Sequence, residues 1–190
     1  MELKQPKKLM LAGDWHGNLP WAFRAINHAK ANGADTILHL GDFGWWIPSE
    51  KTDQFLNELN AELIHCNINL LWIDGNHEYH PSIPHGGEPW NLARFSRITH
   101  LPRGYRWEWW GQTWMALGGA HSVDRLARTP GVDWWPEESL TVGQVHRACG
   151  PGIVDVIVAH DCPPGVAIPG IVELGGKGNR KQKWNPEMFP

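Results

Sequence analysis

Cysteine is scarce in this chain, and its scarcity excludes a small disulfide-stapled protein. The three cysteines, Cys66, Cys149 and Cys162, are odd in number and widely spaced. Disulfide frameworks use even numbers of cysteines. Such sparse usage is typical of a reducing compartment. The sequence therefore predicts a cytoplasmic protein without structural disulfides.

Long hydrophobic runs and an excess of one charge are also lacking. No run approaches the length needed to cross a bilayer, and the charged first eight residues do not form the apolar core of a secretory signal. The formal net charge is only −3, so no overall field draws the chain to nucleic acid or to anionic membranes. We expect no membrane association and no extended nucleic-acid binding. The oligomeric state stays open.

A Gly-x-Ser-x-Gly elbow is absent as well, which argues against a serine hydrolase. What the chain does contain is an alternation of apolar runs and amphipathic segments, which favours an α/β protein with a parallel sheet. In the first half we expect strands at 8–12, 36–40 and 69–73 and helices at 19–31 and 51–65. In the second half we expect strands at 98–101, 105–110, 113–117 and 153–159, a turn at Gly111-Gln112 and a helix at 136–148.

Polar, metal-binding side chains follow four of the predicted strands. The segments are Gly13-Asp14-Trp15-His16, Gly41-Asp42, Gly75-Asn76-His77-Glu78 and His160-Asp161. In open α/β sheets, ligands bind just beyond the carboxyl ends of strands. If the four strands share one sheet, these groups lie side by side. Gly13, Gly41 and Gly75 would allow a close backbone approach or a positive φ.

The residue types in these segments form a mixed oxygen and nitrogen donor set. Carboxylates, an amide oxygen and neutral imidazoles suit first-row transition metals, whereas a structural zinc site would use thiolates. Taken singly, each motif has a plainer interpretation, such as a turn at Gly41-Asp42 or a helix cap at Asn76. Their convergence favours a metal site.

The order and spacing of these motifs across residues 8–163 resemble the calcineurin-like metallophosphoesterase family. Two further segments, Gly118-Gly119-x-x-Ser122-x-Asp124-Arg125 and His160-Asp161-x-Pro163, resemble a bacterial and phage subgroup. The resemblance implies a four-layer α/β sandwich, that is, a β-sandwich flanked by helices. It also implies a metal-dependent phosphoesterase that hydrolyses phosphomonoesters or phosphodiesters, small molecules or nucleotides, by a two-metal hydroxide mechanism.

The same resemblance assigns roles to individual residues. Asp14 and His16 match the ligands of the first metal, Asp42 the bridging carboxylate, and Asn76 and His160 ligands of the second. His77 matches the general acid beside the leaving group. The implied cofactors are two divalent transition-metal ions, with Mn²⁺ as the first choice and Fe, Zn, Ni, Co or Mg as alternatives. Expected substrate contacts are Asn18, His80, His121 and Arg125, and a pocket for an aromatic group is expected from Trp15, Trp45, Trp46 and Trp90.

One motif of the family is not found. The series normally closes with Gly-His-x-His, but after position 121 the only histidines are His146 and His160. We therefore expect a C-terminally shortened sandwich with weaker metal binding. This leaves open an alternative function as a catalytically impaired metal-binding or interaction protein. Residues 1–163 would form the metallophosphoesterase domain, and 164–190 an irregular segment of the same domain.

Overall fold

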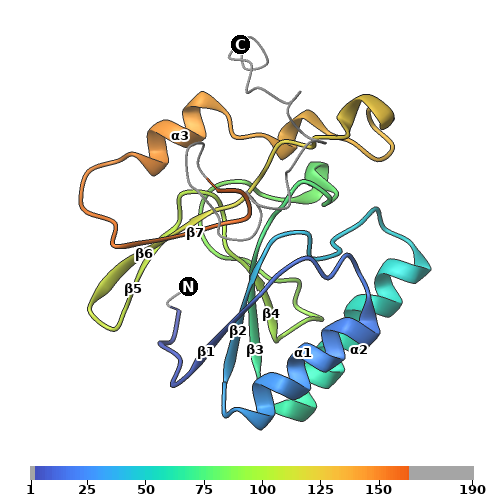
Figure 1. The fold of residues 1–190 in the computed structure, drawn as a ribbon, viewed down its shortest axis with the longest axis vertical. Coiled ribbons are helices and arrows are strands. Elements are labelled where there is room, and N and C mark those ends of the chain that lie inside the picture. Colours follow the sequence, from blue (N-terminus) through green and yellow to red (C-terminus); the bar gives the residue numbers. More distant parts are fainter. Residues whose placement is uncertain (1–2, 163–190) are drawn as a thin grey trace, which may run out of the picture.

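The computed structural model describes residues 3–162, which form two β-sheets stacked face to face with two helices on one side (Figure 1). The first sheet contains β1 (Leu9–Ala12), β2 (Thr36–Leu40), β3 (Asn69–Ile73) and β4 (Ile98–His100), in that order and all parallel. The second contains β5 (Arg106–Trp109), β6 (Gln112–Leu117) and β7 (Val156–Ala159). The expected segment 164–190 lies outside the described residues.

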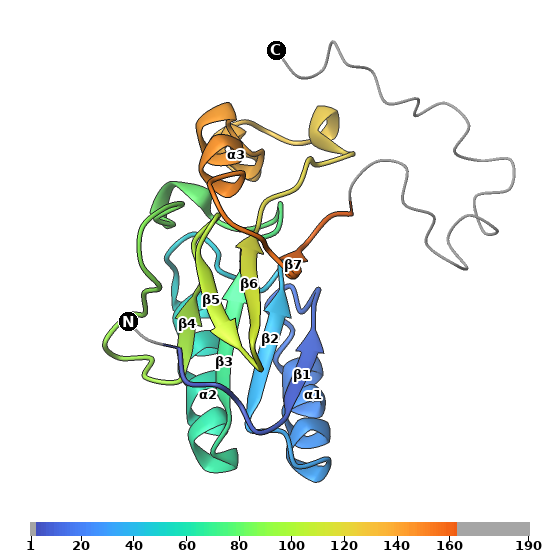
Figure 2. The same ribbon diagram turned by 90° about the vertical axis from the view of Figure 1, so that its left-hand side faces the viewer.

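The helices α1 (Leu19–Ala31) and α2 (Glu50–Cys66) cover the outer face of the first sheet (Figure 2). The side chains of Asn18 and Ser49 cap their first turns. One apolar core lies between these helices and the sheet, and a second lies between the two sheets. Adjacent residues of β2 enter different cores, Ile37 the first and Leu38 the second. Burial on both faces explains why β2 and β3 are largely apolar runs.

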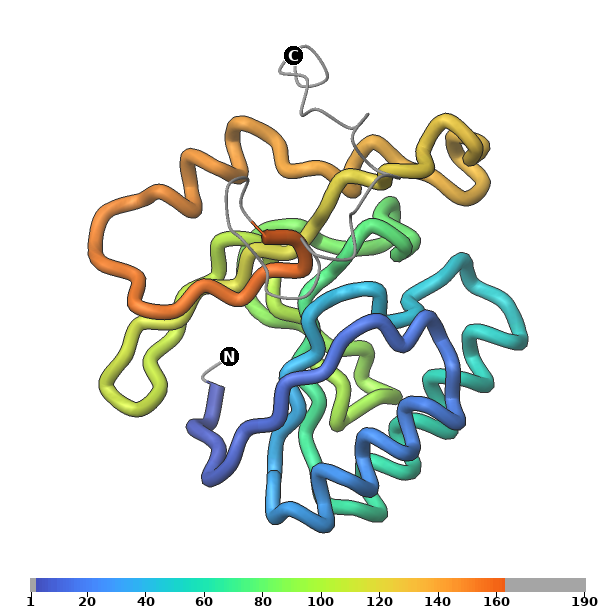
Figure 3. The backbone as a smooth tube through the Cα atoms, in the orientation of Figure 1, coloured from blue at the N-terminus to red at the C-terminus, as the bar shows by residue number. Residues whose placement is uncertain are grey.

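The tube in Figure 3 shows that the N-terminal half of the chain builds the first sheet and its helices, and that the second sheet follows. The α/β class and the five elements predicted for the first half are confirmed, with bounds that agree within one residue. No described helix is long and apolar enough to span a bilayer. Within residues 3–162 the three cysteines are unpaired, as expected.

The hairpin between β5 and β6 turns one residue earlier than predicted. Trp110 and Gly111 occupy the turn, with φ of 51° and 70°. Positive φ at both central residues is the geometry of a type I′ turn, whose twist matches that of the flanking strands. Gln112 therefore belongs to β6 and pairs with Trp109.

The helix predicted at 136–148 is two elements. A 3₁₀ turn, η3 (Pro136–Glu138), is followed by extended residues, and α3 (Val142–Ala148) then begins at a new capping box between Thr141 and Gln144. The prediction failed because Thr141 adopts an extended backbone and starts a helix of its own. Two more 3₁₀ turns, η1 (His80–Ser82) and η2 (Arg125–Ala127), lie in the long loops.

The expectation that all four motif-bearing strands share one sheet is wrong. β1, β2 and β3 belong to the first sheet, but β7 pairs in parallel with β6 in the second. β7 also begins later than predicted, at Val156. Because the two sheets are stacked, the carboxyl end of β7 still reaches the carboxyl ends of β1 and β2.

Candidate metal centre

Asp42 lies at the centre of the predicted site. It follows β2, and its side chain is only 5% exposed. The backbone amides of Asn76 and His77 both donate to its Oδ1, at 3.0 and 2.9 Å. Burial would raise the pKa of this carboxyl, but His160 and the amide of His77 stabilise the charged form and lower the pKa to about 2. Asp42 is therefore a fixed anion.

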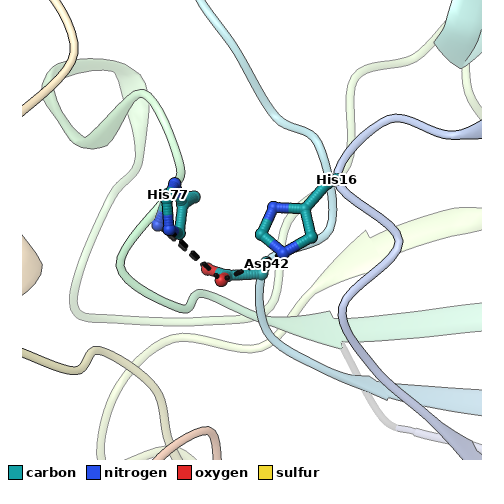
Figure 4. Close-up of side chains that lie close together, drawn as sticks. All are labelled: His16, Asp42 and His77. Atoms are coloured by element: carbon teal, nitrogen blue, oxygen red, sulfur yellow. Dashed lines mark hydrogen bonds and ion pairs between the residues drawn. The ribbon is translucent and has the colours of Figure 1, made fainter. Parts of the chain in front are cut away.

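Three imidazoles surround the other oxygen of Asp42. The Nε2 atoms of His160, His16 and His77 lie 3.5, 3.6 and 3.9 Å from Oδ2. These distances are at or beyond the limit of a hydrogen bond. Figure 4 shows His16 and His77 on opposite sides of the carboxylate, reaching it from two different loops. Each imidazole is therefore directed at a shared space next to Oδ2.

The His160 ring is held by the end of β2. Its Nδ1 lies 2.7 Å from the carbonyl oxygen of Leu40, which can only accept, so Nδ1 carries the proton. Nε2 thus directs a lone pair towards Asp42, the arrangement of most metal-binding histidines. Burial lowers the pKa of His160, but the Asp42 carboxylate outweighs this effect and raises it to about 9. Without a cation, this imidazole would instead pair with Asp42 as a cation itself.

The loop after β1 is attached to the loop after β2. The amides of Asp14, His16 and Gly17 donate to the carbonyls of Gly41, Asp42 and Phe43. Asp14 and His16 adopt positive φ values of 56° and 46°. Their side chains are 69% and 43% exposed, so both face solvent at the mouth of the site. This pairing of the two loops brings Asp14 and His16, which follow β1, next to Asp42, which follows β2.

Asn76 is oriented by a buried relay that the sequence did not reveal. Its Nδ2 donates to the hydroxyl of Ser122 at 3.0 Å, which leaves its Oδ1 for another partner. The Ser122 hydroxyl and backbone amide in turn donate to the fully buried Glu138 carboxylate. The loop after β6 therefore fixes which atom of Asn76 enters the site.

Two of the three motif glycines are required by their surroundings. Gly41 has φ +98°, and a Cβ there would lie 2.5 Å from the His160 ring. A Cβ on Gly75 would lie 2.3 Å from the Asp42 carboxylate. Gly13 has neither a positive φ nor a close contact, so the expectation for it is wrong. Strain at that turn falls on Asp14 instead.

His77 contacts an arginine that was not predicted. Arg128 Nη2 lies 2.6 Å from His77 Nε2, and the same nitrogen donates to Asp124 at 3.0 Å. Because a guanidinium only donates, Nε2 of His77 accepts, and its proton is on Nδ1. Burial lowers the pKa of His77. The charge of Asp42 opposes this effect, and the charge of Arg128 adds to it, so the pKa stays below its ordinary value. No sequence pattern marked Arg128, because its position depends on the conformation of the 118–135 loop.

The side chains fit the metal ions implied by the donor set. Asp42 is shared by two groups whose ligand atoms lie within 4.8 Å of one another: His16, Asp42 and His77, and Asp14, Asp42 and His160. Asn76 borders the same cavity of about 490 Å³. The family pattern pairs Asp14 with His16, whereas the side chains here group Asp14 with His160. In both arrangements Asp42 is the common member.

A third histidine cluster lies deeper, around the buried Asp74. His80 and His85 each lie 3.9 Å from Asp74 Oδ2, but Nε and Nη2 of Arg103 already donate to that oxygen, at 2.9 and 2.6 Å. A cation there would have to compete with a buried guanidinium. This cluster is therefore a structural ion pair with neutral imidazoles around it.

The predicted substrate contacts have different surroundings. His121 borders the metal cavity. Asn18 caps α1 through its side-chain oxygen, and His80 is 1% exposed beside Asp74. The Arg125 guanidinium lies over the Trp134 ring, 5.8 Å from its centroid.

The four tryptophans that were expected to line one aromatic pocket lie in different surroundings. Trp15 and Trp45 are core residues with exposures of 1% and 8%, and the Trp90 ring contacts Trp45 and Trp72. Trp46 lines a cavity that also contains His77, and Trp15 lines a different one beside Gly13. The high number of tryptophans indicated abundant aromatic side chains, but the sequence could not show which of them lie in the core and which line a pocket.

Glu78 joins the two loops that carry Asp42 and Asn76. Its carboxylate oxygens accept from the amides of Phe43 and Gly75, and the side chain is fully buried. Burial, reinforced by the nearby Asp42 charge, raises its pKa to about 8. Glu78 thus holds the backbone of the two loops together through its two oxygens.

Comparison with known proteins agrees with this geometry. No curated protein matches the sequence. The family model for calcineurin-like phosphoesterases matches residues 7–183, which is most of the chain and includes every residue of the site. Members of that family typically bind a dinuclear metal centre. The chain belongs to the calcineurin-like phosphoesterase family.

Proposed function

We propose that this protein hydrolyses phosphomonoesters or phosphodiesters of small molecules at the site centred on Asp42. The observation that carries the proposal is the sharing of Asp42 by two separate groups of metal ligands. The Oδ2 atom of Asp42 lies 3.5–3.9 Å from imidazole nitrogens of both groups, a position suited to a carboxylate shared by two metal ions. Metal ions in such a centre polarise phosphoryl oxygens and lower the pKa of bound water.

The chain's own residues would hold and orient these ions. We assign Asp14, His16 and Asp42 to one ion, and Asp42, Asn76 and His160 to the other. Leu40 O and Ser122 Oγ fix the two ligands His160 and Asn76. Mn²⁺ remains our expectation for the metal, and the cytoplasm for the location.

His77 is our proposed proton donor to the leaving oxygen. Its Nε2 is the ring nitrogen that faces Asp42. In this structure Arg128 donates to that atom, so Nε2 can carry a proton only after Arg128 has moved. We propose that the substrate phosphate, which is a stronger partner for a guanidinium, draws Arg128 away. Arg128 would thus both bind the phosphate and release His77.

The roles of His77 and Arg128 are separable by kinetics. We expect His77→Ala to lower kcat by about 10²–10⁴-fold, the usual contribution of general acid catalysis. The loss should be smaller for p-nitrophenyl phosphate than for an alkyl phosphate, because a good leaving group needs less protonation. Arg128→Ala should raise KM. Equal losses on both substrates would contradict the role of His77, and an unchanged KM would contradict that of Arg128.

The alternative of a catalytically impaired metal-binding protein is not favoured, because the described site contains the predicted general acid as well as the ligands. That alternative predicts metal binding with no turnover above that of the Asp42→Asn variant. The sequence lacks Gly-His-x-His, so the proposal requires other ligands, such as water, to complete the coordination of each ion.

A further inference from the structure

An aromatic groove lies directly beside the metal cavity and shares His77 with it. The groove has a volume of about 420 Å³, within the range of small-molecule pockets. It is lined by Trp46, Ile47, Ser49, Thr52, His77, Tyr79, Val132, Asp133 and Trp135. The metal cavity is lined mainly by charged and polar side chains. The His77 side chain thus borders both a polar cavity and a largely apolar groove.

Two loops supply the aromatic walls of this groove. Trp46 lies on the loop after β2, where a Cβ on Gly17 would come within 2.9 Å of its ring. The absence of a side chain at Gly17 therefore lets the indole lie against the backbone next to His16. Tyr79 and Trp135 meet edge to face with ring centroids 5.3 Å apart. All three rings are half-buried, so each has a surface to offer.

The polar groups of the groove have partners within the chain. Ser49 Oγ accepts from the amide of Thr52, and Thr52 Oγ1 donates to the carbonyl of Ile47. Asp133 Oδ1 accepts from the amide of Thr129. These contacts engage the hydroxyls of Ser49 and Thr52 and one oxygen of Asp133, and the surface left for a ligand is mainly apolar. The remaining surface suits a flat, uncharged ring, which aromatic side chains bind by stacking.

We propose that this groove is the leaving-group subsite and that it selects phosphoesters whose leaving group carries a planar aromatic ring, such as an aryl or nucleoside ester. The inference rests on the proposed function, because His77 marks the leaving-group side only if it protonates the leaving oxygen. Trp46 and Trp135 would then be specificity-determining residues rather than catalytic ones.

The test uses ligands that cannot be hydrolysed, so that it does not depend on turnover. Benzylphosphonate and ethylphosphonate carry the same anionic group with CH₂ in place of the ester oxygen, and only the first has a ring. Their dissociation constants would be measured by calorimetry on the full chain with Mn²⁺. We expect benzylphosphonate to bind about tenfold more tightly, at the lower end of the range for aromatic stacking.

Variants locate the effect in the groove. Trp46→Ala and Trp135→Ala should each reduce the benzyl-to-ethyl preference to about threefold or less, whereas Trp135→Phe should retain most of it. The matched control is Trp21→Ala, which removes a half-exposed indole on α1 outside the groove. Adenosine monophosphate distinguishes nucleoside from simple aryl selectivity in the same assay. Equal binding of the two phosphonates, or a preference unchanged in both alanine variants, would overturn the inference.

The outcome is separable from that of the proposed function. If the parent does not hydrolyse p-nitrophenyl phosphate above the level of Asp42→Asn, the proposed function fails. The phosphonate preference still tests whether the groove binds rings. If the parent is active but shows no preference, the phosphoesterase stands and the aromatic subsite is wrong.

Discussion

The hydroxyl of Ser122 connects the Asn76 side chain to the buried Glu138 carboxylate. Groups that orient a metal ligand are worth about 10–100-fold in metal affinity. We therefore predict that Ser122→Ala weakens binding of the second metal ion by about that factor, because the Asn76 amide loses its fixed orientation. Metal titration monitored by restored hydrolysis measures the change.

Ser96→Ala is the matched control for this prediction, because Ser96 is exposed on a loop outside the cavity linings described for the site. If Ser122→Ala titrates like Ser96→Ala, Asn76 is not oriented through Ser122. If both variants lose affinity, the cause is a general loss of stability, which thermal unfolding would reveal.

At the scale of elements, Glu78 links the loop after β2 to the loop after β3. Glu78→Ala would leave two buried backbone amides without acceptors, at a cost of about 1–3 kcal/mol each. We predict a loss of about 2–5 kcal/mol in the free energy of unfolding, together with weaker metal binding, because Asp42 and Asn76 lose their relative position. Denaturant unfolding measures the first effect.

The control is Glu58→Ala, which removes a carboxylate that accepts from Gln54 one turn away on α2. Such helical pairs contribute about 0.2–0.5 kcal/mol. A loss in Glu78→Ala no larger than in Glu58→Ala would mean that the two loops are held together by other contacts.

Sequence reasoning succeeded where a local pattern was sufficient. Asp42 and Asn76 follow apolar runs that end in glycine, and strand ends of one parallel sheet converge whatever the rest of the chain does. It failed for β7, because the choice of β6 as its partner is a non-local pairing. Ser122 and Arg128 were missed for a related reason, since their contacts depend on the conformation of a long loop.

At the scale of the whole molecule, several buried imidazoles make stability depend on pH. Burial lowers the pKa of His39 to about 3 and those of His80 and His85 to about 4, and it also lowers the pKa of His100. Between pH 6.5 and about 4 the unfolded chain binds protons at these sites and the folded chain does not. Their contribution is therefore complete above pH 6.5 and is lost as the pH falls.

Three other groups must be included in this balance. Glu78 has the opposite effect, because its pKa is raised to about 8. Between pH 4.5 and 8 the folded chain therefore binds one proton more at this site than the unfolded chain does. His160, with its pKa raised to about 9, is protonated in both states below pH 6.5 and contributes no slope there. His77, whose pKa is also lowered, adds to the four buried imidazoles. These five groups outweigh one carboxyl, so we predict that the metal-free protein loses stability on acidification through this window.

Urea unfolding in chelator at pH 7, 6 and 5 tests this prediction. His39→Leu should reduce the slope by about 1.4 kcal/mol per pH unit, the value for one proton, because His39 is fully buried among aromatic rings. His65→Leu, which removes an exposed imidazole on α2, is the control variant. A parent whose stability is flat between pH 7 and 5 would contradict the burial of neutral imidazoles.

The claim that Asp42 organises a dinuclear centre is tested most directly by metal content. The parent and Asp42→Asn would be dialysed against Mn²⁺ and analysed for bound metal, with hydrolysis of bis-p-nitrophenyl phosphate measured on the same samples. Asp53→Asn is the control, because Asp53 lies on α2 and makes a surface ion pair with Arg94. We predict near two ions per chain with turnover in the parent and the control, and loss of both in Asp42→Asn. Equal metal content and turnover in Asp42→Asn and the parent would contradict the account.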